Sequence, residues 1–182
     1  MTKHSKLTSS IKKKAKNIEL LIMDVDGVLT PGYMVYADSG EQVKLFNVQD
    51  GFGVMLWKKA GLKSAIVTAG NAGAVDKRAE VLSIDKVYQS AMDKRIAYDM
   101  LKKDFSLSDE QICFIGDDLI DLPILKRVGF ACCVANGHKD IFHYADYITE
   151  STGGKGAVRE VIDIVLKSKG LWDKVTENYF KS

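Results

Sequence analysis

Short apolar runs recur along this chain of 182 residues, and each ends in small or polar residues. The clearest run, Leu20–Met23, is directly followed by the segment Asp24-Val25-Asp26-Gly27. An apolar run of this length is typical of a strand that is buried on both faces, as in parallel α/β sheets. Further runs of this kind lie at residues 64–68, 86–88, 112–115, 130–134 and 147–148. We therefore predict a parallel sheet.

Segments with helical features separate these runs. A short basic helix from about Ser9 to Asn17 precedes the first strand, and six lysines lie between Lys3 and Lys16. Other helices are expected after the segment 50–53 up to about residue 61, at 72–82, at 94–103, up to residue 128, and at 156–167. The alternation, without repeats or a long linker, predicts one doubly wound, Rossmann-like α/β domain over residues 1–182.

The segment from Tyr33 to Asn47 interrupts this alternation. Aromatic and branched residues flank an Asp-Ser-Gly turn at residues 38–40, a pattern that predicts a β-hairpin. The sides of this hairpin are too apolar for it to stand alone in water. We expect it to pack on the body of the protein or on another subunit.

Composition and charge limit the kinds of partner that this protein is expected to bind. The hydrophobic content of 46% and the charged content of 27% are ordinary for a soluble globular protein. A net charge of +2 does not favour a nucleic-acid partner, and no apolar run approaches the ~20 residues of a membrane span. The three cysteines lie in apolar runs without metal-ligand spacing, as expected for reduced thiols. We expect a cytoplasmic protein without nucleic-acid or membrane partners.

Polar and charged groups follow four of the predicted strands. They are Asp24 with Asp26, then Thr68, then the loop before Lys94, and then Asp117, Asp118 and Asp121. Taken singly, Thr68 is explained as a helix cap, Lys94 as a surface lysine, and the acidic cluster as the first turn of a helix. Right-handed crossovers, however, bring all four strand ends to one edge of the sheet. Together they offer carboxylates for Mg²⁺, a hydroxyl donor and a cation, which suit a phosphoryl group.

These motifs resemble, in order, the four motifs of the haloacid dehalogenase (HAD) superfamily phosphatases. The matching residues are 24–28, Thr68, Lys94 and 116–118, and the similarity extends from about Asn17 to Gly170. Within the superfamily, the chain is most similar to the small 3-deoxy-D-manno-octulosonate 8-phosphate (KDO 8-phosphate) phosphatases of lipopolysaccharide synthesis. Residues 46–51, 116–123 and 153–160 carry this narrower resemblance.

The resemblance implies catalytic roles and a Mg²⁺ cofactor. Asp24 would attack phosphorus and form an aspartyl-phosphate, while Asp26 would act as acid and then as base. Thr68 and Lys94 would bind phosphate oxygens. Mg²⁺ would be held by Asp24, the backbone carbonyl of Asp26, and Asp117, with Asp118 and Asp121 in support.

The resemblance also implies a phosphorylated sugar acid as substrate. The corresponding substrate-contacting positions are Asp26, Asn47, Val48, Gln49, Asp50, Gly51, Met55, Arg78 and Lys94. The family pattern has an arginine where Gln49 stands, and a second arginine where Gly70 stands. Lys77 or Arg78 is the hypothetical replacement for one of these cations. A nine-carbon keto-deoxy sugar acid 9-phosphate therefore remains an alternative substrate.

Members of this small subfamily lack a large cap domain and form tetramers. The resemblance therefore implies a homotetramer, in which the hairpin and the loop 153–156 help to close neighbouring sites. Two other functions share this chemistry. A phosphomutase needs a cap insertion that this chain lacks, and a receiver-type phospho-switch carries its acceptor aspartate mid-chain on the third strand, without a second acid two residues later.

Overall fold

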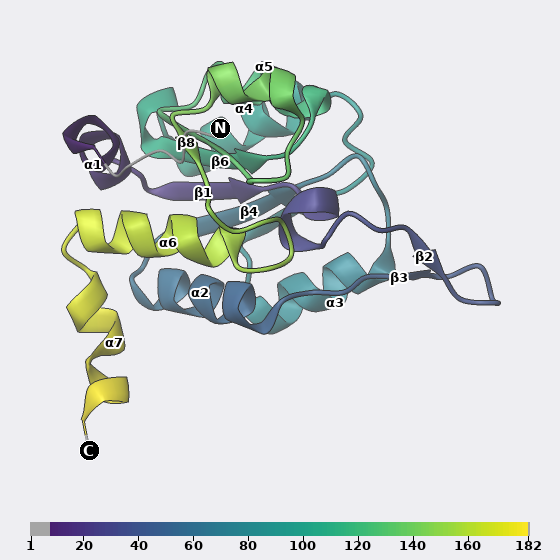
Figure 1. Cartoon of the computed structure of the whole chain (residues 1–182), viewed down its shortest axis with the longest axis horizontal. Helices are drawn as coiled ribbons and strands as arrows, with labels where there is room; N and C mark the ends of the chain where they lie inside the picture. Colours follow the sequence, from purple (N-terminus) through teal and green to yellow (C-terminus); the bar gives the residue numbers. More distant parts are fainter. Residues whose placement is uncertain (1–7, 182) are drawn as a thin grey trace.

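Six parallel strands form the central sheet of the computed structural model, which describes residues 8–181 (Figure 1). They are β1 (Leu20–Met23), β4 (Lys63–Val67), β5 (Lys86–Tyr88), β6 (Ile112–Gly116), β7 (Phe130–Cys133) and β8 (Tyr147–Ile148). Their order across the sheet is β5-β4-β1-β6-β7-β8. The chain starts at the central strand β1, moves outward to β5, and then crosses back to β6. Such a reversal favours ligand binding at the carboxyl ends of the central strands. The predicted doubly wound α/β fold is confirmed.

Helices cover both faces of this sheet (Figure 1). One face carries α1 (Ser9–Lys16), α2 (Val48–Lys59), α3 (Gly73–Leu82) and α6 (Ala157–Ser168), and the other carries α4 (Lys94–Phe105) and α5 (Leu122–Leu125). Alternation along β1 divides its side chains between the two faces. Leu21 and Met23 pack in the first hydrophobic cluster, whereas Leu20 and Ile22 pack in the second. Both faces of β1 are therefore buried, as its sequence predicts.

The predicted basic helix is confirmed as α1, whose Ile11 and Ala15 are buried. The Thr8 side chain caps it by accepting a hydrogen bond from the Ile11 amide at 3.3 Å. Lys3 and Lys6 lie outside the described residues. Within residues 8–181, every helix is too short or too polar to cross a lipid bilayer.

Helix α2 begins earlier than predicted. Its first residue is Val48, and the Asn47 Oδ1 caps it by accepting hydrogen bonds from the amides of residues 49 and 50. The predicted start of this helix after residues 50–53 is therefore wrong, and Gly51 and Gly53 lie inside the helix. A Cβ at Gly51 would lie 2.1 Å from Arg78 Nη2, and one at Gly53 would lie 2.9 Å from Arg159 Cδ. A larger residue at either position would require the neighbouring arginine side chain to shift.

The hairpin is confirmed, but its ladder is short and its outer side does not pack on the body. It consists of β2 (Val35–Tyr36) and β3 (Gln42–Val43), which pair antiparallel. Figure 1 shows it projecting from the body of the protein. Tyr33 is 72% exposed and Leu45 is 59% exposed. The outer side of the hairpin therefore does not pack on the body of its own chain. That it packs on another subunit remains a prediction.

Two helices near the carboxyl end differ from the prediction. Helix α5 ends at Leu125 rather than at residue 128, because the chain already turns toward β7. In that turn, a Cβ at Gly129 would lie 2.5 Å from the Glu110 carbonyl oxygen. Beyond α6, we did not predict α7 (Trp172–Phe180). Its only buried residues are Val175 and Thr176, so most of this helix lies at the surface. The remaining helical turns are short and span Val25–Leu29, Asp109–Gln111, Leu119–Asp121 and Lys139–Tyr144.

Asp50 ties α2 to α6. Its carboxylate accepts hydrogen bonds from the Arg159 amide at 2.8 Å and from the Gly156 amide at 3.2 Å. These amides lie at the start of α6, where no preceding turn supplies acceptors. Burial raises the pKa of Asp50, although the hydrogen bonds from Arg159 and Gly156 oppose that shift.

Replacing Asp50 with alanine is therefore expected to lower the free energy of unfolding by about 2 kcal/mol, because buried amides lose their acceptor. Urea unfolding would measure this loss. Asp173→Ala is the matched control, because Asp173 is an exposed acid in the first turn of α7, and we expect a change below about 0.5 kcal/mol there. Equal effects of the two substitutions would contradict the capping role.

Candidate active site

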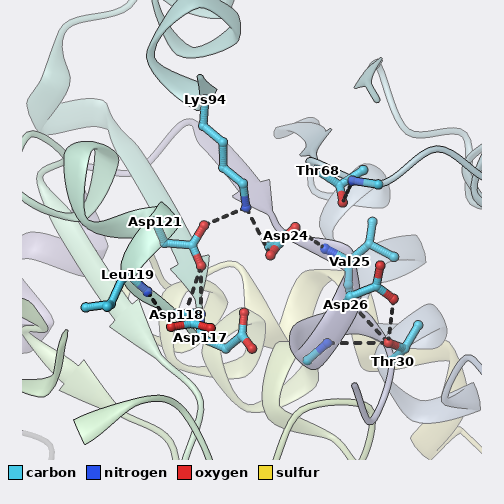
Figure 2. Close-up of polar contacts among 12 residues, drawn as sticks. Asp24, Val25, Asp26, Thr30, Thr68, Lys94, Asp117, Asp118, Leu119 and Asp121 are labelled. Atoms are coloured by element: carbon cyan, nitrogen blue, oxygen red, sulfur yellow. Dashed lines mark hydrogen bonds and ion pairs between the residues drawn. The ribbon is translucent and has the colours of Figure 1, made fainter. Parts of the chain in front are cut away.

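The ends of the central strands gather the predicted polar residues, as expected (Figure 2). Asp24 follows β1, Thr68 follows β4, and Asp117 follows β6, while Lys94 is the first residue of α4. The parallel direction of the strands places these positions at one edge of the sheet. The interpretation of this edge as a single site is therefore supported by the geometry.

Lys94 is a buried cation between two carboxylates. Its Nζ lies 2.6 Å from Asp121 Oδ1 and 3.0 Å from Asp24 Oδ2, and its side chain is 1% exposed. Figure 2 shows the side chain reaching from the start of α4 into the acidic cluster. Burial by itself lowers the pKa of Lys94, but Asp24 and Asp121 raise it above its ordinary value. The explanation of Lys94 as a surface lysine is excluded.

The acidic residues around Lys94 repel one another. Burial raises the pKa of Asp24, against the attraction of Lys94. Burial, followed by the charges of Asp24 and Asp121, raises the pKa of Asp117 to about 7. One ammonium group does not neutralise this cluster, so the site favours a further cation.

The donor atoms suit Mg²⁺. Carboxylate oxygens of Asp24, Asp117 and Asp121 all lie within 4.8 Å of one another. Both oxygens of Asp121 are already engaged, one by Lys94 and the other by the amides of residues 117 and 118. Within residues 8–181, no hydrogen bond reaches the Asp117 carboxylate, which packs against Gly27. An unpaired carboxylate beside Asp24, in an all-oxygen donor set, fits a hard divalent cation.

Stability in the absence of Mg²⁺ should therefore depend on pH. A carboxyl whose pKa is raised in the folded state binds its proton more tightly there than in the unfolded chain, so stability falls as pH rises through the folded pKa. For Asp117, stability is lost as the pH rises from near its ordinary pKa of 3.8 to its raised pKa of about 7. We expect the metal-free protein to lose on the order of 2 kcal/mol of unfolding free energy between pH 5 and pH 8.

Urea unfolding at both pH values, with a chelator and then with Mg²⁺, would measure this dependence. Mg²⁺ should reduce the loss because it binds the ionised carboxylates. The Asp117→Asn variant should show a smaller loss in chelator, since the titrating group is gone. An unchanged loss in that variant would contradict the assignment.

The Asp26 carboxylate points toward Thr30 rather than toward Asp117 (Figure 2). Its carboxylate is held by Lys44, whose Nζ lies 2.5 Å from Oδ1 and 2.6 Å from Oδ2. The Thr30 hydroxyl lies 3.4 Å from Oδ1 and also accepts hydrogen bonds from the amides of Gly27 and Gly32. Neither Lys44 nor Thr30 was among the predicted site residues, because alternation along the hairpin does not show which of its sides faces the body.

Thr68 and Gly70 lie beside Asp26. The Thr68 hydroxyl oxygen accepts a hydrogen bond from the Gly70 amide at 3.3 Å, and its own proton is left for another acceptor. A Cβ at Gly70 would lie 3.3 Å from Asp26 Oδ2 and 3.7 Å from Thr68 Oγ1. The position where the family pattern carries an arginine is thus adjacent to Asp26, and here it has no side chain.

The other predicted substrate positions gather around the start of α2. Arg78 Nη2 donates to the Asn47 carbonyl oxygen at 3.2 Å and packs against Gly51, and its guanidinium lies over the Phe46 ring. Asp50 faces α6 instead. The side chains of Val48, Gln49 and Met55 are exposed on α2, and none of them is brought to the acidic cluster.

The glycine-rich loop at residues 153–156 packs on the loop that follows β1. The Gly154 amide donates to the Val28 carbonyl oxygen at 2.8 Å. A Cβ at Gly153 would overlap the Gly27 carbonyl oxygen, at 1.6 Å, so only glycine allows this approach. The Asn136 side chain fixes the loop by accepting from the Gly153 amide at 2.8 Å. The loop therefore supports the segment around Gly27 and Val28 in its own chain.

A family model and the relatives of known name indicate the same family for this chain. A family model described as haloacid dehalogenase-like hydrolase matches residues 72–162. The 3-deoxy-D-manno-octulosonate 8-phosphate phosphatase of Escherichia coli (strain K12) is 39% identical over 173 residues, which are 95% of this chain and 92% of that protein.

Solved structures agree with this match. The phosphatase of the same name from Moraxella catarrhalis, in complex with a magnesium ion, a phosphate ion and KDO, has a TM-score of 0.92 and 39% identity over 94% of this chain and 99% of that chain. The phosphatase of the same name from Yersinia pestis has a TM-score of 0.91 and 38% identity over 94% of this chain and 93% of that chain. The chain therefore belongs to the haloacid dehalogenase-like hydrolases and, among them, to the family of the 3-deoxy-D-manno-octulosonate 8-phosphate phosphatases.

Proposed function

We propose that this chain is a Mg²⁺-dependent phosphatase that hydrolyses KDO 8-phosphate to KDO and phosphate in cytoplasmic lipopolysaccharide biosynthesis. The observation that carries the proposal is the pair of neighbouring carboxylates, Asp24 and Asp117, beside the buried ammonium of Lys94. A phosphate monoester needs such an arrangement of a nucleophile, a cation site and a fixed positive charge. The names and bound ligands of the relatives support the choice of substrate.

The reaction begins at Asp24. A carboxylate oxygen of Asp24 forms a bond to phosphorus, the bond from phosphorus to the sugar oxygen breaks, and Asp26 gives its proton to that oxygen. Asp26 then takes a proton from the water that hydrolyses the aspartyl-phosphate. Asp24, the Asp26 carbonyl and Asp117 would hold Mg²⁺, which would supply positive charge against the phosphoryl oxygens.

Lys94 and Thr68 hold the phosphoryl group. The Lys94 ammonium already lies beside Asp24, so it neutralises charge where the new bond forms. The Thr68 hydroxyl keeps its proton for a phosphoryl oxygen, because its own oxygen accepts from Gly70. Removing one such preorganised donor typically costs ~3 kcal/mol, or about two decades in rate.

The residues at the start of α2 recognise the sugar acid in this proposal. Arg78 donates a hydrogen bond to the Asn47 carbonyl oxygen, and it takes the role of an arginine that the family pattern has elsewhere. Gln49 and Gly51 flank the same turn. Val48 and Met55 are exposed, as is the apolar outer side of the hairpin, and a homotetramer would cover such surfaces.

Phosphate release from KDO 8-phosphate, compared with a panel of sugar phosphates, tests the proposal. The panel includes a nine-carbon keto-deoxy sugar acid 9-phosphate, and each assay is run with Mg²⁺ and with a chelator. Strong Mg²⁺-dependent preference for KDO 8-phosphate is the expected result. Preference for the nine-carbon acid would keep the chemistry and change the substrate. A phosphorylated protein that persists for minutes to hours would instead indicate a receiver-like switch.

A further inference from the structure

The hairpin presents one polar face to the catalytic loop. Side chains alternate along the second half of the hairpin, where Val43 and Leu45 are exposed and Gln42, Lys44 and Phe46 are more buried. The Lys44 side chain is 3% exposed. The buried Gln42 Oε1 has no hydrogen-bond partner within residues 8–181. The inner face of the hairpin is therefore built into the site rather than lying loosely over it.

Lys44 is the main restraint on the Asp26 carboxylate. Its Nζ contacts both oxygens, at 2.5 and 2.6 Å, and this charge-assisted contact holds the direction in which the carboxylate points. The hydroxyl of Thr30 lies farther away, at 3.4 Å from Oδ1. Gly70 lies beside Oδ2 but has no side chain to hold it. Asp26 itself is 29% exposed, so without Lys44 its side chain would be free to turn toward solvent.

We propose that Lys44 is a positioning residue for Asp26, and that the hairpin thereby controls proton transfer to the leaving sugar oxygen. The inference rests on the proposed phosphatase function. Proton transfer requires the donor and acceptor atoms to lie within about 2.6–3.2 Å, and a misplacement of about 1 Å costs on the order of 10²-fold in rate. When Asp26 carries its proton on one oxygen, Lys44 keeps its contact with the other.

This role predicts a dependence on the leaving group. When Asp24 attacks phosphorus, the electron pair of the breaking bond goes to the ester oxygen. An alkyl oxygen of a sugar is a strong base and needs the Asp26 proton as the bond breaks. The aryl oxygen of p-nitrophenyl phosphate delocalises the charge and leaves without that proton. Loss of Lys44 should therefore slow the sugar ester more than the aryl ester.

The experiment measures kcat/KM with Mg²⁺ for KDO 8-phosphate and for p-nitrophenyl phosphate. In Lys44→Met, which keeps the length of the side chain, we expect a fall of about 10²-fold for the sugar ester and of less than about 10-fold for the aryl ester. Lys44→Arg should restore most of the lost rate because it keeps a donor for the carboxylate. Lys86→Met, which removes a surface ion pair with Asp104, is the control and should stay within about twofold of the unmodified protein.

A double-mutant cycle with Asp26→Asn separates positioning from direct binding. If Lys44 acts through Asp26, then Lys44→Met should cause little further loss for the sugar ester in the Asp26→Asn background. An equal further loss there, or equal losses for both esters in the single variant, would overturn the inference while leaving the phosphatase function in place. A folded unmodified protein that is inactive on every sugar phosphate would overturn the proposed function and the inference together.

Discussion

Replacing Asp24 with asparagine is expected to lower kcat by at least about 10⁴-fold and to leave the fold intact. The amide of asparagine is a poor nucleophile, so the variant cannot form the aspartyl-phosphate at this position. The folded protein should not lose stability without Mg²⁺, because burial and Asp121 disfavour the charge of Asp24 and the amide carries none. Phosphate release and urea unfolding would measure the two effects separately.

Asp38→Asn is the matched control for this prediction, because Asp38 is an exposed aspartate in the turn of the hairpin. It should change the rate by less than about twofold and the free energy of unfolding by less than about 0.5 kcal/mol. An Asp24→Asn protein that is folded and still active would refute the aspartyl-phosphate mechanism.

Replacing Lys94 with methionine should both stop turnover and destabilise the protein. The ammonium pairs with Asp24 and Asp121, which are both buried, and its removal leaves their charges uncompensated. Breaking a buried pair by removing one partner typically costs about 3–5 kcal/mol. We expect a loss of this size in urea unfolding at pH 7.5 with a chelator, and a smaller loss with Mg²⁺, because the metal ion replaces part of the missing positive charge.

A surface lysine provides the comparison. Lys63 pairs with Asp85 at 3.3 Å, but its side chain is 49% exposed, so Lys63→Met should cost less than about 1 kcal/mol. If Lys94→Met were no more destabilising than Lys63→Met, the buried ammonium would not be needed to balance the acidic cluster. Identical losses for Lys94→Met with Mg²⁺ and with chelator would speak against a cation site at Asp24 and Asp117.

The sequence was sufficient to predict the sheet and the edge where the site lies. Runs such as Leu20–Met23 need burial on both faces, and this requirement implies a parallel sheet covered by helices. Once the strands are parallel, the positions of Asp24, Thr68 and Asp117 follow from topology alone. These predictions depend on local patterns and on general rules of chain connection.

The features that could not be predicted from the sequence depend on contacts between segments that are far apart along the chain. Gly51 looks like a loop residue until Arg78 is seen to pack against it, and Asp50 looks like a site residue until its hydrogen bonds to α6 are seen. Lys44 lies in a hairpin whose inward side cannot be chosen from alternation alone, since both sides contain apolar residues. Such contacts become visible only when the chain is folded.

The docking of the Gly153–Gly154 turn on the Gly27–Val28 backbone has a consequence for synthesis on the ribosome. The segment that carries Asp24 and Val28 is synthesised well before Gly154, whose amide donates a hydrogen bond to the Val28 carbonyl oxygen. Strand β1 pairs with β4 on one edge and with β6 on the other, so one of its edges stays unpaired until β6 has been synthesised. A nascent chain therefore carries Asp24 without its folded surroundings until the segment around Gly154 has also been synthesised and can dock on Val28.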